Sequence, residues 1–75
     1  MRLSRAKKRQ FLEVTELTGD RELNSRLNSF GIGEGARIRV VAFGALHSTI
    51  NVEVDESGCV ALRHSEANAI KVREI

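Results

Sequence analysis

Hydrophobic and polar residues alternate along five short segments of the chain. Alternation with a period of two places every second side chain on one face of a β-strand, so each segment is predicted to be a strand with one face against a core. A polar turn at residues 56–58 suits an antiparallel meander. The predicted strands are residues 11–17, 37–43, 50–55, 59–63 and 70–72.

One segment has the spacing of an α-helix instead. Leu23, Leu27 and Phe30 stand at i, i+4 and i+7, which places all three on one helical face and predicts that they belong to the core. Asp20 is suited to accept free backbone N–H groups at the start of this helix. Gly31 suits the left-handed position just after its end.

These elements predict a mostly β fold in one small domain. With 75 residues, the sheet is too small for a two-layer sandwich, and a strongly bent five-stranded barrel leaves the fewest open edges. The helix lies between the first two strands, and a short helical turn at residues 66–69 precedes the last. We expect a basic N-terminal arm at residues 1–10 and a single barrel domain over residues 11–75.

Basic charge is concentrated in the arm. Residues 1–10 contain five Lys or Arg side chains and no acid, whereas residues 11–75 contain seven basic and ten acidic side chains. Such an arm attracts nucleic-acid phosphates or an anionic membrane surface. The chain has no Trp or Tyr, and Phe11, Phe30 and Phe43 are expected in the core, so nucleic acid is not the favoured partner. The chain contains no apolar run long enough to span a membrane, so membrane association would be peripheral.

Candidate groups for chemistry are few. Cys59 is the single cysteine, which favours a reducing compartment, and we interpret it as a buried thiol in a strand. His47 and His64 are interpreted as surface residues, because they and Cys59 lack the paired spacing of a metal site. No oxyanion element accompanies the His47–Ser48 or Cys59–His64 pairs, so we expect neither catalysis nor a cofactor. Residues 31–36 fit the G-x-G-x-x-G/A pattern, but the helix precedes them and a strand follows, so they predict a turn.

A break between two predicted strands, residues 44–49, carries one apolar residue that is a candidate for partner binding. Leu46 stands in this break, where a hairpin loop would expose it to solvent and allow it to anchor a partner. The alternative is that Leu46 folds back as a lid on the small core. The two interpretations differ in whether Leu46 is exposed.

Two longer segments resemble the FeoA family. Residues 23–38, LNSRLNSFGIGEGARI, look like its "RL..LGI.pGa.I" segment, and residues 61–72, ALRHSEANAIKV, resemble its "iaLR..eA..I.V" closing segment. With the strand pair between them, the resemblance covers residues 11–73. The family's Lys-Pro-Gly-Gln-like entry turn is here only Lys8-Arg9-Gln10. The loop that often reads Ala-Pro-Leu-Gly-Asp-Pro is here residues 43–48, which keep the leucine but no proline.

The resemblance implies an SH3-like barrel and a small cytoplasmic protein of bacterial ferrous-iron uptake that acts with the membrane transporter FeoB. Family members are not known as enzymes. Similar barrels also form the C-terminal domain of DtxR-type iron-dependent repressors.

On this basis we expect a non-catalytic accessory protein that docks on the cytoplasmic side of an FeoB-like transporter. Residues 2–9 would add attraction to an acidic protein or lipid surface. One alternative is a small nucleic-acid-binding barrel that uses the basic arm, and another is direct iron binding through His47, His64 or Cys59. The residues expected to contact the transporter are Ala45, Leu46, His47 and Ser48.

Overall fold

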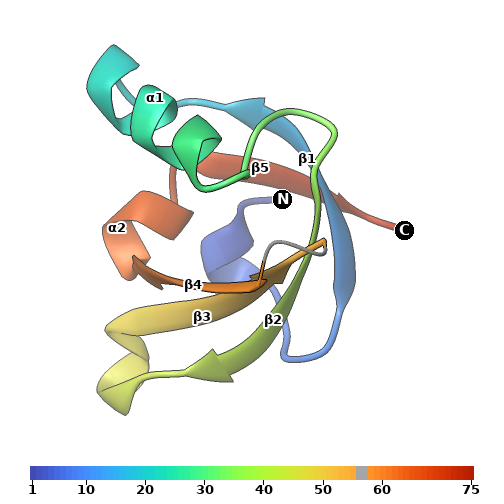
Figure 1. Ribbon diagram of the computed structural model, residues 1–75. Helices are drawn as coiled ribbons and strands as arrows, with labels where there is room; N and C mark the ends of the chain where they lie inside the picture. Colours follow the sequence, from blue (N-terminus) through green and yellow to red (C-terminus); the bar gives the residue numbers. More distant parts are fainter. Residues whose placement is uncertain (56–57) are drawn as a thin grey trace.

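The structure, a computed structural model, describes residues 1–55 and 58–75. Within these residues, five antiparallel strands form one sheet in the order β4-β3-β2-β1-β5 (Figure 1). The strands are β1 (Phe11–Leu17), β2 (Arg37–Phe43), β3 (Thr49–Val54), β4 (Gly58–Arg63) and β5 (Ile70–Glu74). The helices are α1 (Arg21–Ser29) and α2 (His64–Ala67), and two short 3-10 turns are η1 (Leu3–Arg5) and η2 (Ala45–His47).

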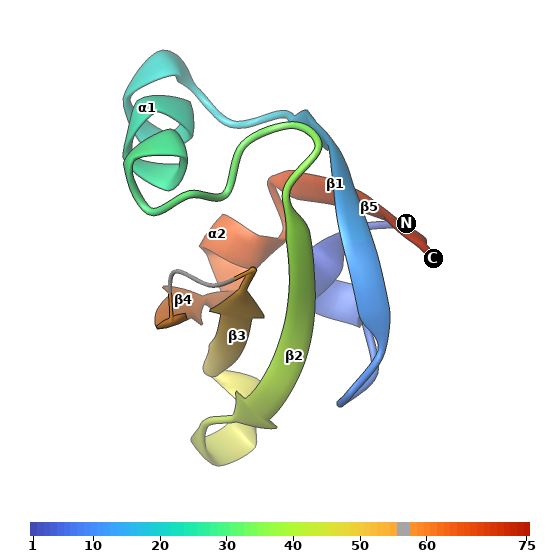
Figure 2. The same cartoon turned by 45° about the vertical axis from the view of Figure 1, so that its right-hand side comes forward.

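The sheet is bent into a small barrel. Its register shifts between Val14 and Glu16 of β1 and between Val40 and Ala42 of β2, and such bulges bend and twist a strand. Figure 2 shows β1 and β2 curving around the interior. Between the edge strands β4 and β5, α2 contacts β4 and η1, and η1 contacts β5. The prediction of a mostly β, five-stranded SH3-like fold, with a helix after the first strand and a helical turn before the last, is confirmed.

The core consists of apolar side chains from alternate strand positions. In β3, for example, Ile50, Val52 and Val54 are at most 1% exposed, while the residues between them are partly exposed. Burial of each such side chain stabilises the fold by about 1.5–3 kcal/mol. No polar or charged residue is buried in the described part of the chain, so the core there consists of apolar residues.

Helix α1 starts and ends where the sequence predicts. The Asp20 carboxylate accepts the backbone N–H of Leu23 at 2.8 Å, and Gly31 follows the helix with φ 86°. Leu27 is fully buried and connects the helix to the core. Phe30 is not in the core, because it lies just beyond the last helical residue and the helical spacing no longer applies to it. Its side chain is 40% exposed.

Two further predictions of burial are wrong. Phe11 is 59% exposed, because the alternation of β1 that buries Leu12 turns Phe11 to the outer face. Cys59 is also exposed, on the outer face of β4. Phe43 is partly buried against the core.

The first ten residues are not a free arm, which corrects the expected division of the chain. Leu3 is fully buried and Ala6 is 6% exposed, because the 3-10 turn η1 places both against the core. The Met1 amino group donates to the Val72 carbonyl at 3.0 Å, and Arg2 forms a bridge to β5. The segment therefore covers the outer edge of β5 and belongs to the barrel.

Two local features complete the fold. Of the predicted turn at residues 56–58, the first two lie outside the described residues, and Gly58 has φ 100°. Helix α2 begins at His64, two residues earlier than predicted, and the Glu66 carboxylate accepts the N–H of Arg63 at 2.8 Å, which stabilises the first turn. None of the described helices has the length and apolar character needed to cross a bilayer.

Candidate functional site

The loop between β2 and β3 (residues 44–48, the β2–β3 loop) is held by backbone hydrogen bonds. The Gly44 N–H donates to the Thr49 carbonyl at 2.8 Å and closes the loop. Inside it, the N–H groups of His47 and Ser48 each donate to a carbonyl three residues earlier at 3.0 Å. A Cβ atom on Gly44 would overlap Thr49 Oγ1. The loop therefore has a defined conformation although it contains no proline.

Leu46 is presented to solvent at the tip of the β2–β3 loop. Its side chain is 98% exposed, so the interpretation of Leu46 as a lid on the core is excluded. Leu46 and His47 both have left-handed backbones, with φ 54° and 58°. Consecutive non-glycine residues in this region are uncommon and are found where the surrounding structure imposes them.

The base of the loop is supported by an aromatic contact. The His47 ring lies 4.7 Å from the Phe43 ring, centroid to centroid, at an interplanar angle of 35°. The contact links the end of β2 to the β2–β3 loop. Ser48 donates its hydroxyl to the Ala45 carbonyl at 2.8 Å, so all four predicted contact residues belong to one ordered loop.

The three candidate iron ligands do not form a cluster. The N–H of His64 donates to the Ser48 carbonyl at 3.1 Å, so the backbone of His64 lies next to the β2–β3 loop that contains His47. Cys59 instead pairs with Glu53, near the other end of the β3–β4 hairpin. Over residues 1–55 and 58–75, the structure places no three His, Cys, Asp or Glu side chains where they could hold one metal ion.

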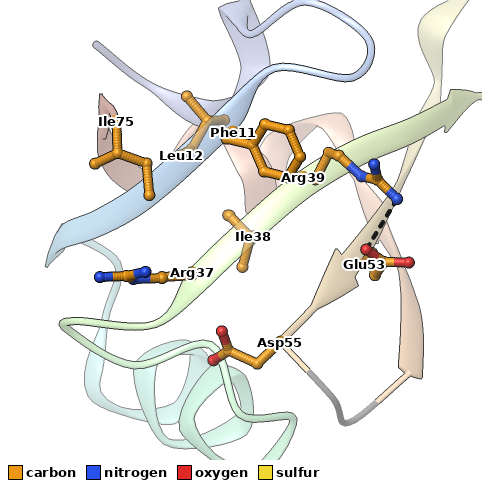
Figure 3. A pocket seen from close by; sticks show the side chains of 8 residues that line it. All are labelled: Phe11, Leu12, Arg37, Ile38, Arg39, Glu53, Asp55 and Ile75. Atoms are coloured by element: carbon orange, nitrogen blue, oxygen red, sulfur yellow. Dashed lines mark hydrogen bonds and ion pairs between the residues drawn. The ribbon is translucent and has the colours of Figure 1, made fainter.

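A second surface feature is a shallow recess of about 160 Å³ at the start of β1 (the Phe11 recess; Figure 3). The Arg39 guanidinium lies 5.2 Å from the centroid of the Phe11 ring and donates to the Glu53 carboxylate at 3.0 Å. Ile75 closes the opposite side, and its N–H donates to the Phe11 carbonyl at 3.1 Å. The lining residues are Phe11, Leu12, Arg37, Ile38, Arg39, Glu53, Asp55 and Ile75.

The Phe11 recess is lined by apolar side chains and by charged side chains of both signs. Its lining contains no Ser, Cys or His, and its two arginines are balanced by two carboxylates. Sequence reasoning missed the recess because Phe11 was assigned to the core. The outward position of Phe11 in the strand alternation was the available signal.

Comparison with known proteins identifies the family. The family model described as "FeoA domain" matches residues 1–74. The chain belongs to the FeoA family. Its match includes the first ten residues, in agreement with their packing against the barrel of this FeoA-family chain.

Related proteins and solved structures are similar to this chain over its whole length. A Campylobacter jejuni protein described as Fe(2+) transport protein A is 36% identical over 75 residues, the full length of both chains. The solution structure of the FeoA protein from Chlorobium tepidum superposes with a TM-score of 0.92 at 29% identity, covering 100% of this chain and 70% of that one. A manganese-dependent transcriptional repressor contains a similar domain: the TM-score is 0.91 at 25% identity, covering all of this chain and 36% of the repressor.

Proposed function

We propose that this FeoA-family chain is a non-catalytic accessory protein of ferrous-iron uptake in the cytoplasm. We propose further that it binds the cytoplasmic part of an FeoB-type transporter through the β2–β3 loop. The family match and the Fe(2+) transport name of the Campylobacter jejuni relative support the iron-uptake role. The free, exposed thiol of Cys59 is compatible with a reducing compartment.

The observation that carries the docking proposal is the exposure of Leu46. An apolar side chain that is 98% exposed contributes nothing to the core of the free protein. When a partner covers it, its full apolar surface is removed from water, which contributes about 1.5–3 kcal/mol to binding. Because hydrogen bonds already hold the β2–β3 loop, little conformational entropy is lost on docking.

The apolar interior and the lining of the Phe11 recess support a non-catalytic role. No polar or charged residue is buried among the described residues, and the lining of the recess contains no Ser, Cys or His. A surface that contacts another protein needs no such groups. We therefore assign the binding function to the β2–β3 loop.

The direct test measures binding of wild type and Leu46→Ser to the soluble cytoplasmic domain of the transporter by calorimetry. We expect the substitution to weaken binding by roughly 10- to 150-fold, the equivalent of losing one buried leucine. Urea unfolding should give the same stability for both proteins within about 0.5 kcal/mol, as for other exposed positions.

A matched control replaces an aliphatic residue at the other candidate surface. Ile75→Ser removes an apolar side chain that is 49% exposed and lines the Phe11 recess. We expect it to leave binding unchanged. Unchanged affinity of Leu46→Ser together with weakened binding of Ile75→Ser would transfer the docking site to the recess and overturn the assignment to the β2–β3 loop.

A further inference from the structure

The N-terminal cations stand on an ordered turn. The Gln10 N–H donates to the Lys7 carbonyl at 3.3 Å, and the Lys7 N–H donates to the Gln10 side-chain oxygen at 3.1 Å. The Arg9 N–H donates to the Val40 carbonyl of β2 at 2.7 Å. Together with the burial of Leu3 and Ala6, these bonds fix the segment against the barrel.

Four side chains on this segment carry unneutralised positive charge. They belong to residues 5–9, which we call the basic turn. All four are exposed, and within the described residues their charged groups form no ion pair or side-chain hydrogen bond. Arg2 differs, because its guanidinium donates to the Asn68 carbonyl at 2.9 Å. The four cations are Arg5, Lys7, Lys8 and Arg9.

One of these cations occupies a strained backbone position. Arg9 has φ 69°, in the left-handed region that glycine adopts without strain and other residues disfavour. A glycine would keep the hydrogen bond to Val40 and relieve the strain. Strained residues of this kind concentrate at functional sites, so the charge of Arg9 is placed there at the expense of stability.

The basic turn and the β2–β3 loop lie at the same end of the barrel. Strand β1 begins at this end, and its antiparallel neighbour β2 ends there. In both Figure 1 and Figure 2 the blue turn before β1 and the yellow η2 point to the same end. Residues 11–75 carry a formal charge of −3, so the molecule is polarised with its positive end at the basic turn.

We propose that the basic turn is a docking site for the anionic headgroups of a membrane surface. A planar negative surface attracts one end of a polarised molecule and leaves its acidic remainder in solution. This orientation places the exposed Leu46 next to the membrane, where the cytoplasmic face of a transporter begins. The lipid contact goes beyond the proposed function and does not depend on it.

The structure favours lipid over nucleic acid at this site. Binding of single strands combines cations with aromatic faces on which bases stack. The aromatic residue next to the basic turn is Phe11, and the Arg39 guanidinium already covers its ring. The Phe11 ring is therefore not a free stacking platform for a base.

The test is co-sedimentation of the full chain with vesicles of phosphatidylcholine and with vesicles of equal parts phosphatidylcholine and phosphatidylglycerol. We expect binding only to the anionic vesicles, with an affinity that falls as salt rises. The variant Lys7→Gln/Lys8→Gln should bind about 30-fold more weakly, because each cation near such a surface contributes about 1 kcal/mol. The matched control Arg21→Gln/Arg37→Gln removes two exposed cations outside the basic turn, one on α1 and one at the start of β2, and should bind within about threefold of wild type.

Three results would overturn the proposal. The first is equal binding to neutral and anionic vesicles, and the second is an equal loss of affinity in the two double variants. The third is binding of single-stranded RNA that is tighter than vesicle binding and is lost in Lys7→Gln/Lys8→Gln, which would assign the basic turn to nucleic acid. Leu46→Ser keeps all four cations of the basic turn and should keep the selectivity for anionic over neutral vesicles, so failure of the transporter contact and failure of the lipid contact are distinguishable.

Discussion

Replacing Arg9 by glycine is expected to stabilise the folded chain. Arg9 has φ 69°, and a left-handed backbone costs a non-glycine residue roughly 1–2 kcal/mol. Glycine avoids this cost but loses more backbone freedom on folding, which offsets roughly 0.5–1 kcal/mol of the gain. We expect a net increase of about 0.5–1 kcal/mol in the free energy of unfolding, or about 2–8 °C in Tm for a domain of this size.

The measurement is thermal and urea unfolding followed by far-UV circular dichroism, because the chain has no Trp or Tyr for fluorescence. Arg9→Ala is the first control, since it removes the same charge and keeps the strained backbone. We expect its stability to stay within about 0.5 kcal/mol of wild type. Arg9→Gly and Arg9→Ala should weaken vesicle binding equally, which separates the charge from the strain.

Gly35→Ala measures, within the same fold, how much stability a non-glycine residue loses when its backbone is left-handed. Gly35 has φ 88°, and a Cβ atom placed there would meet nothing within 4 Å, so the substitution tests the left-handed backbone without a clash. It should destabilise the fold by about 1 kcal/mol. If Gly35→Ala shows this loss and Arg9→Gly also lowers stability, the reasoning is refuted, because the arginine side chain would then contribute more than the strain removes.

Three other substitutions test how the fold holds the site. Gly44→Ala should cost about 1–3 kcal/mol, because its Cβ would overlap Thr49 Oγ1; adding Thr49→Ala should restore part of this stability in urea unfolding. Leu27→Ala should cost about 2–5 kcal/mol, because Leu27 is fully buried, and a loss below about 1 kcal/mol would contradict its role in the core. The Arg26 and Glu66 side chains form an ion pair that joins α1 to α2, and they are 54% and 14% exposed. A double-mutant cycle with glutamine at both positions should give a coupling free energy of about 0.5–1 kcal/mol that falls as salt rises. Zero coupling would show that the ion pair does not contribute to the stability of α1.

The local pattern of hydrophobic and polar residues was sufficient to predict most of the strands and the helix α1. The two-residue alternation and the spacing of Leu23 and Leu27 predicted the strands and the helix, because burial on one face of an element imposes the period of that element on the sequence. Asp20 and Gly31 predicted the ends of α1. The free N–H groups at the start of a helix need a side-chain acceptor, and the left-handed residue after its end favours glycine, so both ends are visible in the sequence. The two blocks of family resemblance led to the FeoA assignment, which the family match confirms.

Contacts between distant segments decided the rest. Leu3 and Ala6 are too few to show a period, and only their packing near β5 and α2 shows that the basic segment belongs to the barrel. Whether Leu46 is a lid or a contact depends on the loop closed by Gly44 and Thr49 and on the left-handed backbone of Leu46 itself. The residue types in the sequence determined which side chains are charged or apolar. The three-dimensional packing determined which of them face solvent at the same end of the molecule.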